Sequence, residues 1–238
     1  MSTVPASPQG PDRGRTHRET DAFRELVESH AGPGSADWCR TLLLCAADLA
    51  VVPDGAVFLR TPTGGVGAAV ATDPQLLSVS AALASGPWGP LARCVDLRET
   101  VSVGAAHSDD RPGAPLTALG FAGVHLFPVR HRTDCHGAVM LCDRVPNRLS
   151  PRQSDSVDFI AGAAGLLLFH ARESDEMRRT VSQLQHALDS RVVIEQAKGY
   201  VAGRDGQDLD GAFRVLRETA RSQRRPVADV AREVLSTR

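Results

Sequence analysis

Three segments at the end of the chain decide how the sequence is read: "QLQHALDSRVVIEQAKGYVAGR" (183–204), "LDGAFRVLRETARSQ" (209–223) and "PVADVAREVL" (226–235). Each segment repeats apolar residues at helical spacing, which predicts three helices. The third gathers its apolar residues on one stripe, which is typical of a helix packed in a core. The segments therefore predict a small helical unit that follows a larger domain.

The second of these predicted helices carries arginines on one side. Four of them are spaced 3, 4 and 3 residues apart and so share one helical face: they are Arg214, Arg217, Arg221 and Arg224. Residues 211–225 hold five arginines and one acid, Glu218, so their local charge is +4. Guanidinium groups bind phosphates and base edges, so the stripe can lie along a phosphate backbone. The alternative is a solvated face on which Glu218 pairs with a neighbouring arginine.

The first predicted helix adds two cations and a glycine. Arg191 and Lys198 lie seven residues apart on one face, and Glu195 between them could pair with Arg191. Gly199, followed by Tyr200, costs a helix about 1 kcal/mol relative to alanine. It therefore indicates close backbone approach by another helix or a ligand. The alternative is that the helix begins to fray there.

The upstream part of the chain predicts an α+β domain with a mostly antiparallel sheet flanked by helices, because short strands joined by tight turns pair with their neighbours. The expected strands form two hairpins, 55–61 with 65–72 and 123–132 with 136–144, and one further strand, 100–104. The expected helices cover 21–30, 36–51 after the N-cap Ser35, 73–85, and a long segment from 151.

No Gly or Pro lies between Gly165 and Gly199, so the long helix is predicted to continue into the tail. Its apolar seam has 3-4 spacing and comprises Ile160, Ala163, Leu167, Met177, Val181, Leu184 and Leu188. Polar His170 and Ser174 interrupt it. Such a seam favours a coiled coil with a second copy of the chain. The alternative is a helix packed on its own domain.

Composition excludes several classes of function. The chain of 238 residues has a formal net charge of −1, so any attraction to a polyanion must be local. Aromatic residues make up 4%, which argues against base stacking as the main mode of recognition. Five cysteines without a CxxC pair predict free thiols rather than disulfides or a zinc site. No signal peptide or membrane span is apparent, so we expect a cytoplasmic protein.

Catalytic motifs are absent: the sequence has no GxSxG, HExxH or P-loop. His107, Asp109 and Asp110 cluster in one segment, but a polar loop explains them better than a metal site. Adjacent Cys135 and His136 would point to opposite faces of a strand. We therefore expect no enzymatic activity, no cofactor and no metal.

The tail resembles the ANTAR domain, an RNA-binding transcription-antitermination module. The resemblance lies in "SRVVIEQAKG" (190–199), "AFRVLR" (212–217) and Val230-Ala231. The first 170 residues resemble the GAF sensor domain in element order, in "SGPWGPLARC" (85–94) and in "HGAVMLCDR" (136–144). The resemblance implies a GAF-like α+β domain, a coiled coil and a three-helix bundle. It also implies a homodimer that binds paired hairpin loops in nascent RNA.

These observations predict a disordered tail at 1–20, a GAF-like domain at 21–170, and a coiled-coil linker with an ANTAR-like RNA-binding domain at 171–238. The expected RNA contacts are Arg191, Lys198, Gly199, Tyr200, Arg214, Arg217, Arg221 and Arg224. An unknown small molecule would bind near Trp88, His107 and Phe121. Two alternatives remain open: a protein-interaction and dimerisation module, or a small-molecule sensor whose helical tail is only structural.

Overall fold

The computed structural model describes residues 13–61, 63–77, 89–104, 118–145 and 149–236. Two compact units make up the chain, Met1–Arg172 and Glu173–Arg238. The helix α6 (Pro151–Asp205) begins in the first unit and ends in the second. Within the described residues, no helix is long and apolar enough to cross a membrane.

The first unit is built on a five-stranded antiparallel sheet in the order β2-β1-β5-β4-β3. The strands are β1 (Asp54–Arg60), β2 (Val66–Ala71), β3 (Val101–Gly104), β4 (Gly123–His131) and β5 (Asp134–Asp143). The two predicted hairpins and the single strand are confirmed, because β1 pairs with β2 and β4 pairs with β5. The pairing of β1 with β5 joins the two hairpins into one sheet.

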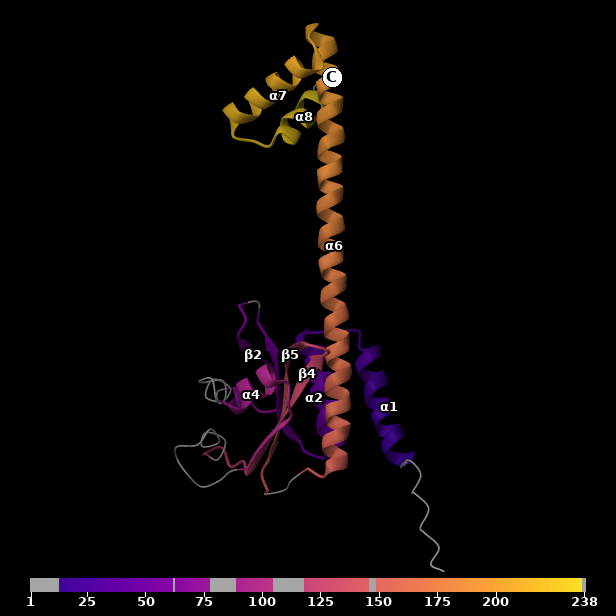
Figure 1. Ribbon diagram of the computed structural model, residues 1–238, viewed down its shortest axis with the longest axis vertical. Helices are drawn as coiled ribbons and strands as arrows, with labels where there is room; N and C mark the ends of the chain where they lie inside the picture. The colour runs from indigo at the N-terminus through magenta and orange to yellow at the C-terminus, as the bar shows by residue number, and fades with distance from the viewer. Residues whose placement is uncertain (1–12, 62, 78–88, 105–117, 146–148, 237–238) are drawn as a thin grey trace, which may run out of the picture. The chain divides into compact units, whose positions relative to one another are not determined.

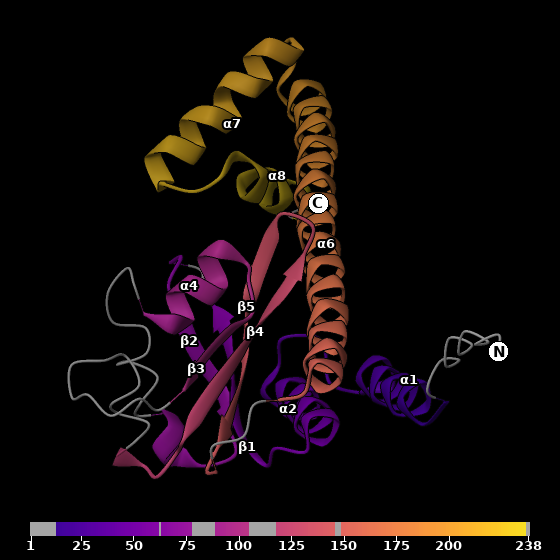
Figure 2. The same ribbon diagram turned by 60° about the horizontal axis from the view of Figure 1, so that its bottom comes forward.

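Helices cover both faces of this sheet (Figures 1 and 2). On one face, α1 (Arg13–Glu28), α2 (Ala36–Ala50) and the first turns of α6 enclose a core that includes Trp38, Phe127 and Ile160. On the other face, α4 (Pro90–Leu97) packs over a second core. The predicted α+β architecture is confirmed. The predicted N-cap is also confirmed, since the hydroxyl of Ser35 accepts a hydrogen bond from the backbone N–H of Trp38 at 3.3 Å.

Three expectations about local structure need correction. The disordered tail is wrong for residues 13–20, which form the first turns of α1. There Glu19 accepts a hydrogen bond from Ser156 at 2.6 Å, and this contact between distant residues was not visible in a local pattern. The helix α4 was not predicted, although Pro90 at its first turn and three buried apolar residues at helical spacing, Leu91, Cys94 and Val95, mark it. Of the helix predicted over 73–85, residues 74–77 are helical and the remainder lies outside the described residues.

All five cysteines are free, as predicted. Cys39, Cys45, Cys94 and Cys142 are buried, and burial is the main cause that raises the pKa of each thiol. The pKa of Cys39 rises to about 11 and that of Cys142 to about 12. These thiols therefore stay protonated and pack as small apolar side chains.

Two histidines are buried in the described part of the sheet, and they differ in their hydrogen bonds. The imidazole of His125 on β4 contacts the hydroxyl of Ser102 at 2.9 Å and the carboxylate of Asp143 at 3.1 Å, which links three neighbouring strands. His136 on β5 differs, because neither ring nitrogen has a hydrogen bond in the described structure. Burial, followed by the charge of Arg172, lowers the pKa of His136. Its imidazole therefore favours the neutral form.

Close packing of α6 on the sheet requires a glycine at one position. A Cβ added to Gly165 would lie 2.3 Å from the backbone oxygen of Arg130, whereas a Cβ on Gly162 would meet nothing within 4 Å. We predict that Gly165→Ala destabilises the protein by about 1–3 kcal/mol, because the helix or the strand must shift. Gly162→Ala in the same helix should stabilise it by about 0.5–1 kcal/mol through helix propensity.

Urea unfolding of the two variants measures both changes against the wild-type protein. Equal stabilisation by both alanines would contradict the packing of α6 on β4.

Candidate nucleic-acid interface

The second unit is a three-helix arrangement around a small apolar core. The end of α6, α7 (Leu209–Gln223) and α8 (Val227–Ser236) all contribute to it. Figure 1 shows α7 and α8 beside the last turns of α6. The buried residues are Ala197, Val201, Ala212, Leu216, Ala220, Val230 and Ala231. The prediction that helix α8 is a core element is confirmed, and this core determines which face of α7 points to solvent.

The N-terminus of α7 is defined by a cap. Asp208 accepts a hydrogen bond from the backbone N–H of Gly211 at 2.7 Å, as expected of an N-cap. A Cβ on Gly211 would lie 2.9 Å from that same Asp208 oxygen, so glycine leaves room for the cap. Before it, Gly206 adopts a positive φ of 63° and ends α6. These two turns orient α7 relative to α6.

Three arginines occupy the outward face of α7. Arg214, Arg217 and Arg221 are exposed and lie opposite the buried Ala212 and Leu216. In the described part of the chain, no hydrogen bond or ion pair joins Glu218 to any of them. The solvated pairing considered as an alternative is therefore not observed. The face presents guanidinium groups whose donors are available to an anion.

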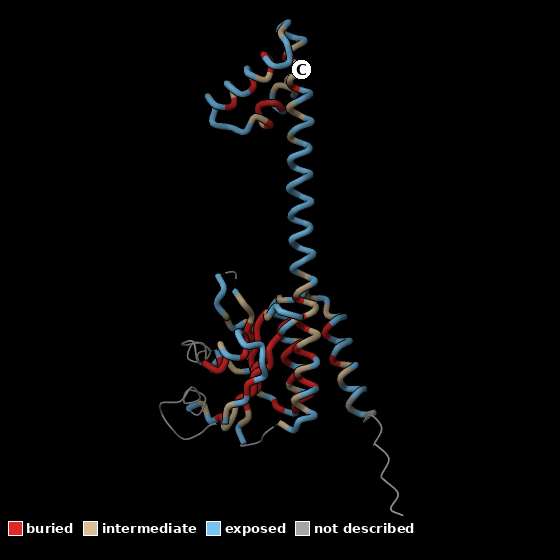
Figure 3. The backbone as a smooth tube through the Cα atoms, viewed as in Figure 1, coloured by how far each residue is buried: buried red, intermediate tan, exposed pale blue. Residues whose placement is uncertain are grey.

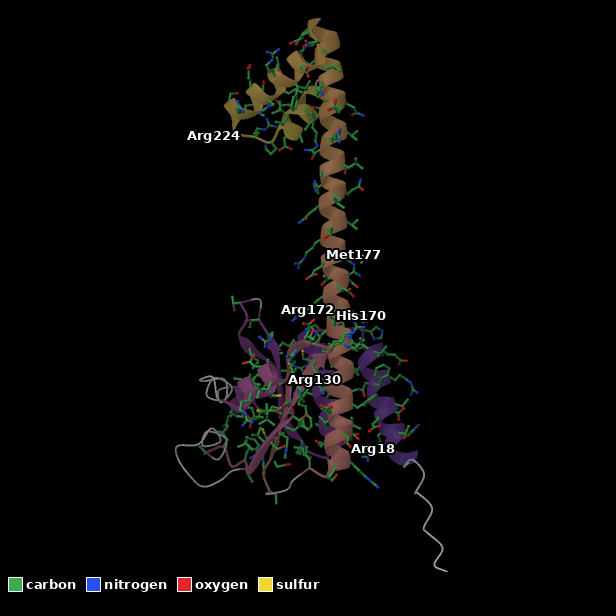
Figure 4. The ribbon with its side chains drawn as sticks, viewed as in Figure 1. Arg18, Arg130, His170, Arg172, Met177 and Arg224 are labelled. Atoms are coloured by element: carbon green, nitrogen blue, oxygen red, sulfur yellow. The ribbon has the colours of Figure 1, made fainter. Side chains whose placement is uncertain are left out.

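Arg224 departs from the predicted stripe. It is the C-cap of α7, with φ 53° and ψ 41°, so it has left the helix. Figure 4 labels it at the end of α7, in the turn before α8. Spacing alone assumed a continuing helix, whereas Pro226 two residues later cannot continue one. Arg224 is exposed at the edge of the surface and does not share the helical face of Arg214.

The lysine of α6 is restrained rather than free. Its ammonium nitrogen lies 3.1 and 2.9 Å from the two carboxylate oxygens of Glu195, and the Lys198 side chain is only 15% exposed. The expected pairing of Glu195 with Arg191 is therefore wrong. Lys198 lies one turn from Glu195 and competes successfully for the carboxylate. Arg191 remains exposed on α6.

Phe213 of α7 joins the two helices at this point. The Lys198 ammonium lies 5.3 Å from the centre of the Phe213 ring, and the Arg217 guanidinium lies 5.7 Å from it. Both distances fall within the range of cation–π contacts. Sequence reasoning missed Phe213, although an aromatic residue four positions before an arginine on a helix is a recognisable signal.

The remaining predicted contacts lie elsewhere on α6. Tyr200 is half-buried, and the guanidinium of Arg204 lies 5.9 Å from its ring. Gly199 is exposed, and nothing in the described chain comes within 4 Å of a Cβ placed there. Close approach by a helix of the same described chain is therefore excluded, and α6 does not fray at Gly199 but continues to Asp205.

Two other arginines of this unit are paired and provide a contrast. Arg225 contacts the carboxylate of Glu233 at 2.6 Å, and Arg232 pairs with Asp229 one turn away on α8. Their positive charges are locally balanced. Among the described residues of this unit, the exposed arginines that form no ion pair are Arg179 and Arg191 on α6, Arg214, Arg217 and Arg221 on α7, and its C-cap Arg224.

Of the three residues predicted to line a small-molecule pocket, Phe121 alone lies in the described part of the chain. Trp88 and His107 lie outside the described residues. Phe121 is 3% exposed and belongs to the core, where the guanidinium of Arg144 lies 4.5 Å from its ring. Among the described residues, no group of His, Cys, Asp and Glu side chains is arranged to hold a metal ion.

Comparisons with known proteins find a different similarity for each of the two units. Residues 182–235 match the ANTAR domain family. A search of curated proteins finds no match to the chain.

Three solved structures resemble the chain in fold. The GAF domain of an Acinetobacter phosphoenolpyruvate-protein phosphotransferase has TM-score 0.52 and 11% identity, over 68% of this chain and 97% of that one. A GAF domain assigned to a sensor histidine kinase of Pseudomonas syringae pv. tomato has TM-score 0.51 and 15% identity, over 70% and 93%. The chromophore-binding domain of a bacteriophytochrome from R. palustris has TM-score 0.52 and 10% identity, over 72% and 65%.

These likenesses confirm the GAF fold of the first unit, and the family match confirms the ANTAR resemblance of the tail. Residues 182–235 thus match the ANTAR domain family, and they follow a unit that has the GAF fold.

Proposed function

We propose that this protein is a non-enzymatic regulator that binds hairpin loops in nascent RNA through its ANTAR domain and prevents transcription termination. The observation that carries the proposal is the exposed, unpaired arginine face of α7 within the segment that matches the ANTAR domain. Three guanidinium groups on one face, without a paired acid, suit a phosphate backbone. In a chain of net charge −1, this local surface supplies the attraction that overall charge does not.

In this proposal the GAF-fold domain senses a signal or acts as the scaffold of a dimer. Its fold likeness to sensor and chromophore-binding domains supports that role without identifying a ligand. The proposal keeps the small-molecule site that the sequence predicts near Trp88, His107 and Phe121. The alternatives are a protein-interaction module or a small-molecule sensor with a structural tail, and each predicts no preference for RNA.

A homodimer is also part of the proposal. Figure 3 colours most of α6 within the second unit as exposed. Its large apolar side chains there that are between 48% and 67% exposed are Met177, Val181, Leu184, Leu188 and Val192. The spacing of the first four, 4, 3 and 4 residues, is that of a two-stranded coiled coil. A second copy of α6 would cover this face. Parallel pairing would bring Glu173 of one copy near Arg178 of the other, an attractive pair at coiled-coil g and e positions.

We predict that Arg214→Ala weakens binding to an RNA with two six-base hairpin loops by about tenfold, because a charge-assisted contact is lost. The salt dependence of binding, log Kd against log salt concentration, should fall by about 0.7–0.9. Fluorescence anisotropy at several salt concentrations measures both quantities. Arg232→Ala is the matched control, since Arg232 is already paired with Asp229, and it should leave both quantities unchanged.

Duplex DNA of equal charge provides the comparison for the nucleic acid itself. Equal affinity of the wild-type protein for the RNA and for this DNA would contradict the antitermination proposal, as would equal effects of the two arginine variants.

We predict that Leu184→Glu weakens dimerisation by about hundredfold, because a carboxylate would be buried without a partner in the helical seam. His186→Glu, on the opposite face of the same helix, should leave the dimer intact. Sedimentation velocity over a concentration series measures the dimer dissociation constant of each variant. A wild-type protein that stays monomeric at micromolar concentration would rule out the proposed pairing of α6.

A further inference from the structure

The cluster of Lys198, Phe213 and Arg217 differs from the rest of the cationic surface. Its centre is an aromatic ring that is only half-buried, with one cation from α6 and another from α7 placed against it. The three side chains occupy the boundary between the two helices. Segment 182–235 contains only two Phe, Tyr or Trp residues, and Phe213 is the one beside the arginine face.

Charge at this cluster is locally balanced on the α6 side. Both carboxylate oxygens of Glu195 hold the Lys198 ammonium, so that pair carries no net charge. A phosphate approaching Lys198 would meet the carboxylate of Glu195 as well, and that repulsion lowers the gain from the ammonium. The geometry therefore disfavours a phosphate at Lys198, in contrast to the exposed Arg214 and Arg221.

A nucleobase fits the same groups better. Unpaired bases stack on aromatic rings and on guanidinium planes, and RNA loops are recognised mainly through such splayed bases. Arg217, held against the Phe213 ring, presents a flat guanidinium beside that ring. The Glu195 carboxylate can accept hydrogen bonds from the N–H groups at a base edge, which a phosphate does not offer.

We propose that Lys198, Phe213 and Arg217, with Glu195, form a binding site for one unpaired nucleobase of an RNA loop. This inference rests on the proposed RNA-binding function and deepens it. Arg214 and Arg221 attract the backbone of any nucleic acid, whereas the base site selects a strand whose bases are unstacked. Duplex bases are stacked and paired, so the site discriminates hairpin loops from duplex of equal charge.

Packing of the domain does not require an aromatic residue at this position. The core of α7 is made by Ala212, Leu216 and Ala220, and Phe213 is outside the buried set. Phe213→Leu keeps an apolar side chain of moderate size and removes the ring face. Phe213→Tyr keeps the ring and serves as the conservative control.

The test uses the full-length protein and a two-hairpin RNA, together with RNAs that carry an abasic site at each loop position in turn. Removal of one particular base should weaken wild-type binding by about tenfold, the usual loss for one stacked base. Phe213→Leu should bind the intact RNA about tenfold more weakly, with no further loss on the abasic RNA. Its salt dependence should equal that of the wild type, because no phosphate contact is removed.

Phe213→Tyr should bind the intact RNA as the wild type does and should respond to the same abasic position. Additive losses for Phe213→Leu and the abasic RNA would overturn the proposal, because two groups in contact cannot act independently. Undiminished binding by Phe213→Leu would overturn it as well.

Thermal unfolding checks that the leucine variant folds. If it does not, the wild-type abasic series decides: loss at one position supports the base site, and less than twofold loss at every position overturns it. That second result leaves the proposed RNA binding intact. Equal wild-type affinity for RNA and duplex DNA would instead overturn the proposed function and the base site with it.

Discussion

The cationic surface depends on the packing of small residues between three helices. Ala197 of α6, Ala212 and Ala220 of α7, and Ala231 of α8 are almost completely buried, which lets the helices approach closely. This packing directs the arginines of α7 outward and brings Phe213 within 5.3 Å of the Lys198 ammonium. A larger side chain at any of these alanines would push the helices apart, and the cations would then move with the helices that carry them. The chemistry of the surface is thus a consequence of how closely α7 lies against α6.

Short-range periodicity and turn chemistry account for the elements that could be predicted from the sequence. The two hairpins, the N-cap Ser35 and the long helix from Pro151 all appear where local patterns placed them. The outward orientation of Arg214 and Arg217 could also be predicted, because helical spacing determines the face once the helix exists. The α+β fold could be inferred from the order of these elements.

Choices between competing partners could not be predicted from the sequence. Glu195 has a cation about one turn away on each side, Arg191 and Lys198, and only the structure shows that it pairs with Lys198. Arg224 matched the spacing of the stripe, but the turn before Pro226 places it in a left-handed conformation. Overall aromatic content does not show where a single ring lies, and packing brings the Phe213 ring within cation–π distance of both Lys198 and Arg217.

The central claim is that the unpaired arginines of α7 and α6 form the RNA-binding surface. Arginine Nε–Hε resonances observed by NMR during titration with a hairpin RNA test it most directly, because each guanidinium reports separately. The account predicts large shifts for Arg191, Arg214, Arg217 and Arg221, and small ones for Arg225 and Arg232, whose carboxylate partners already hold them. Shifts concentrated on Arg225 and Arg232, with the α7 face unperturbed, would contradict it.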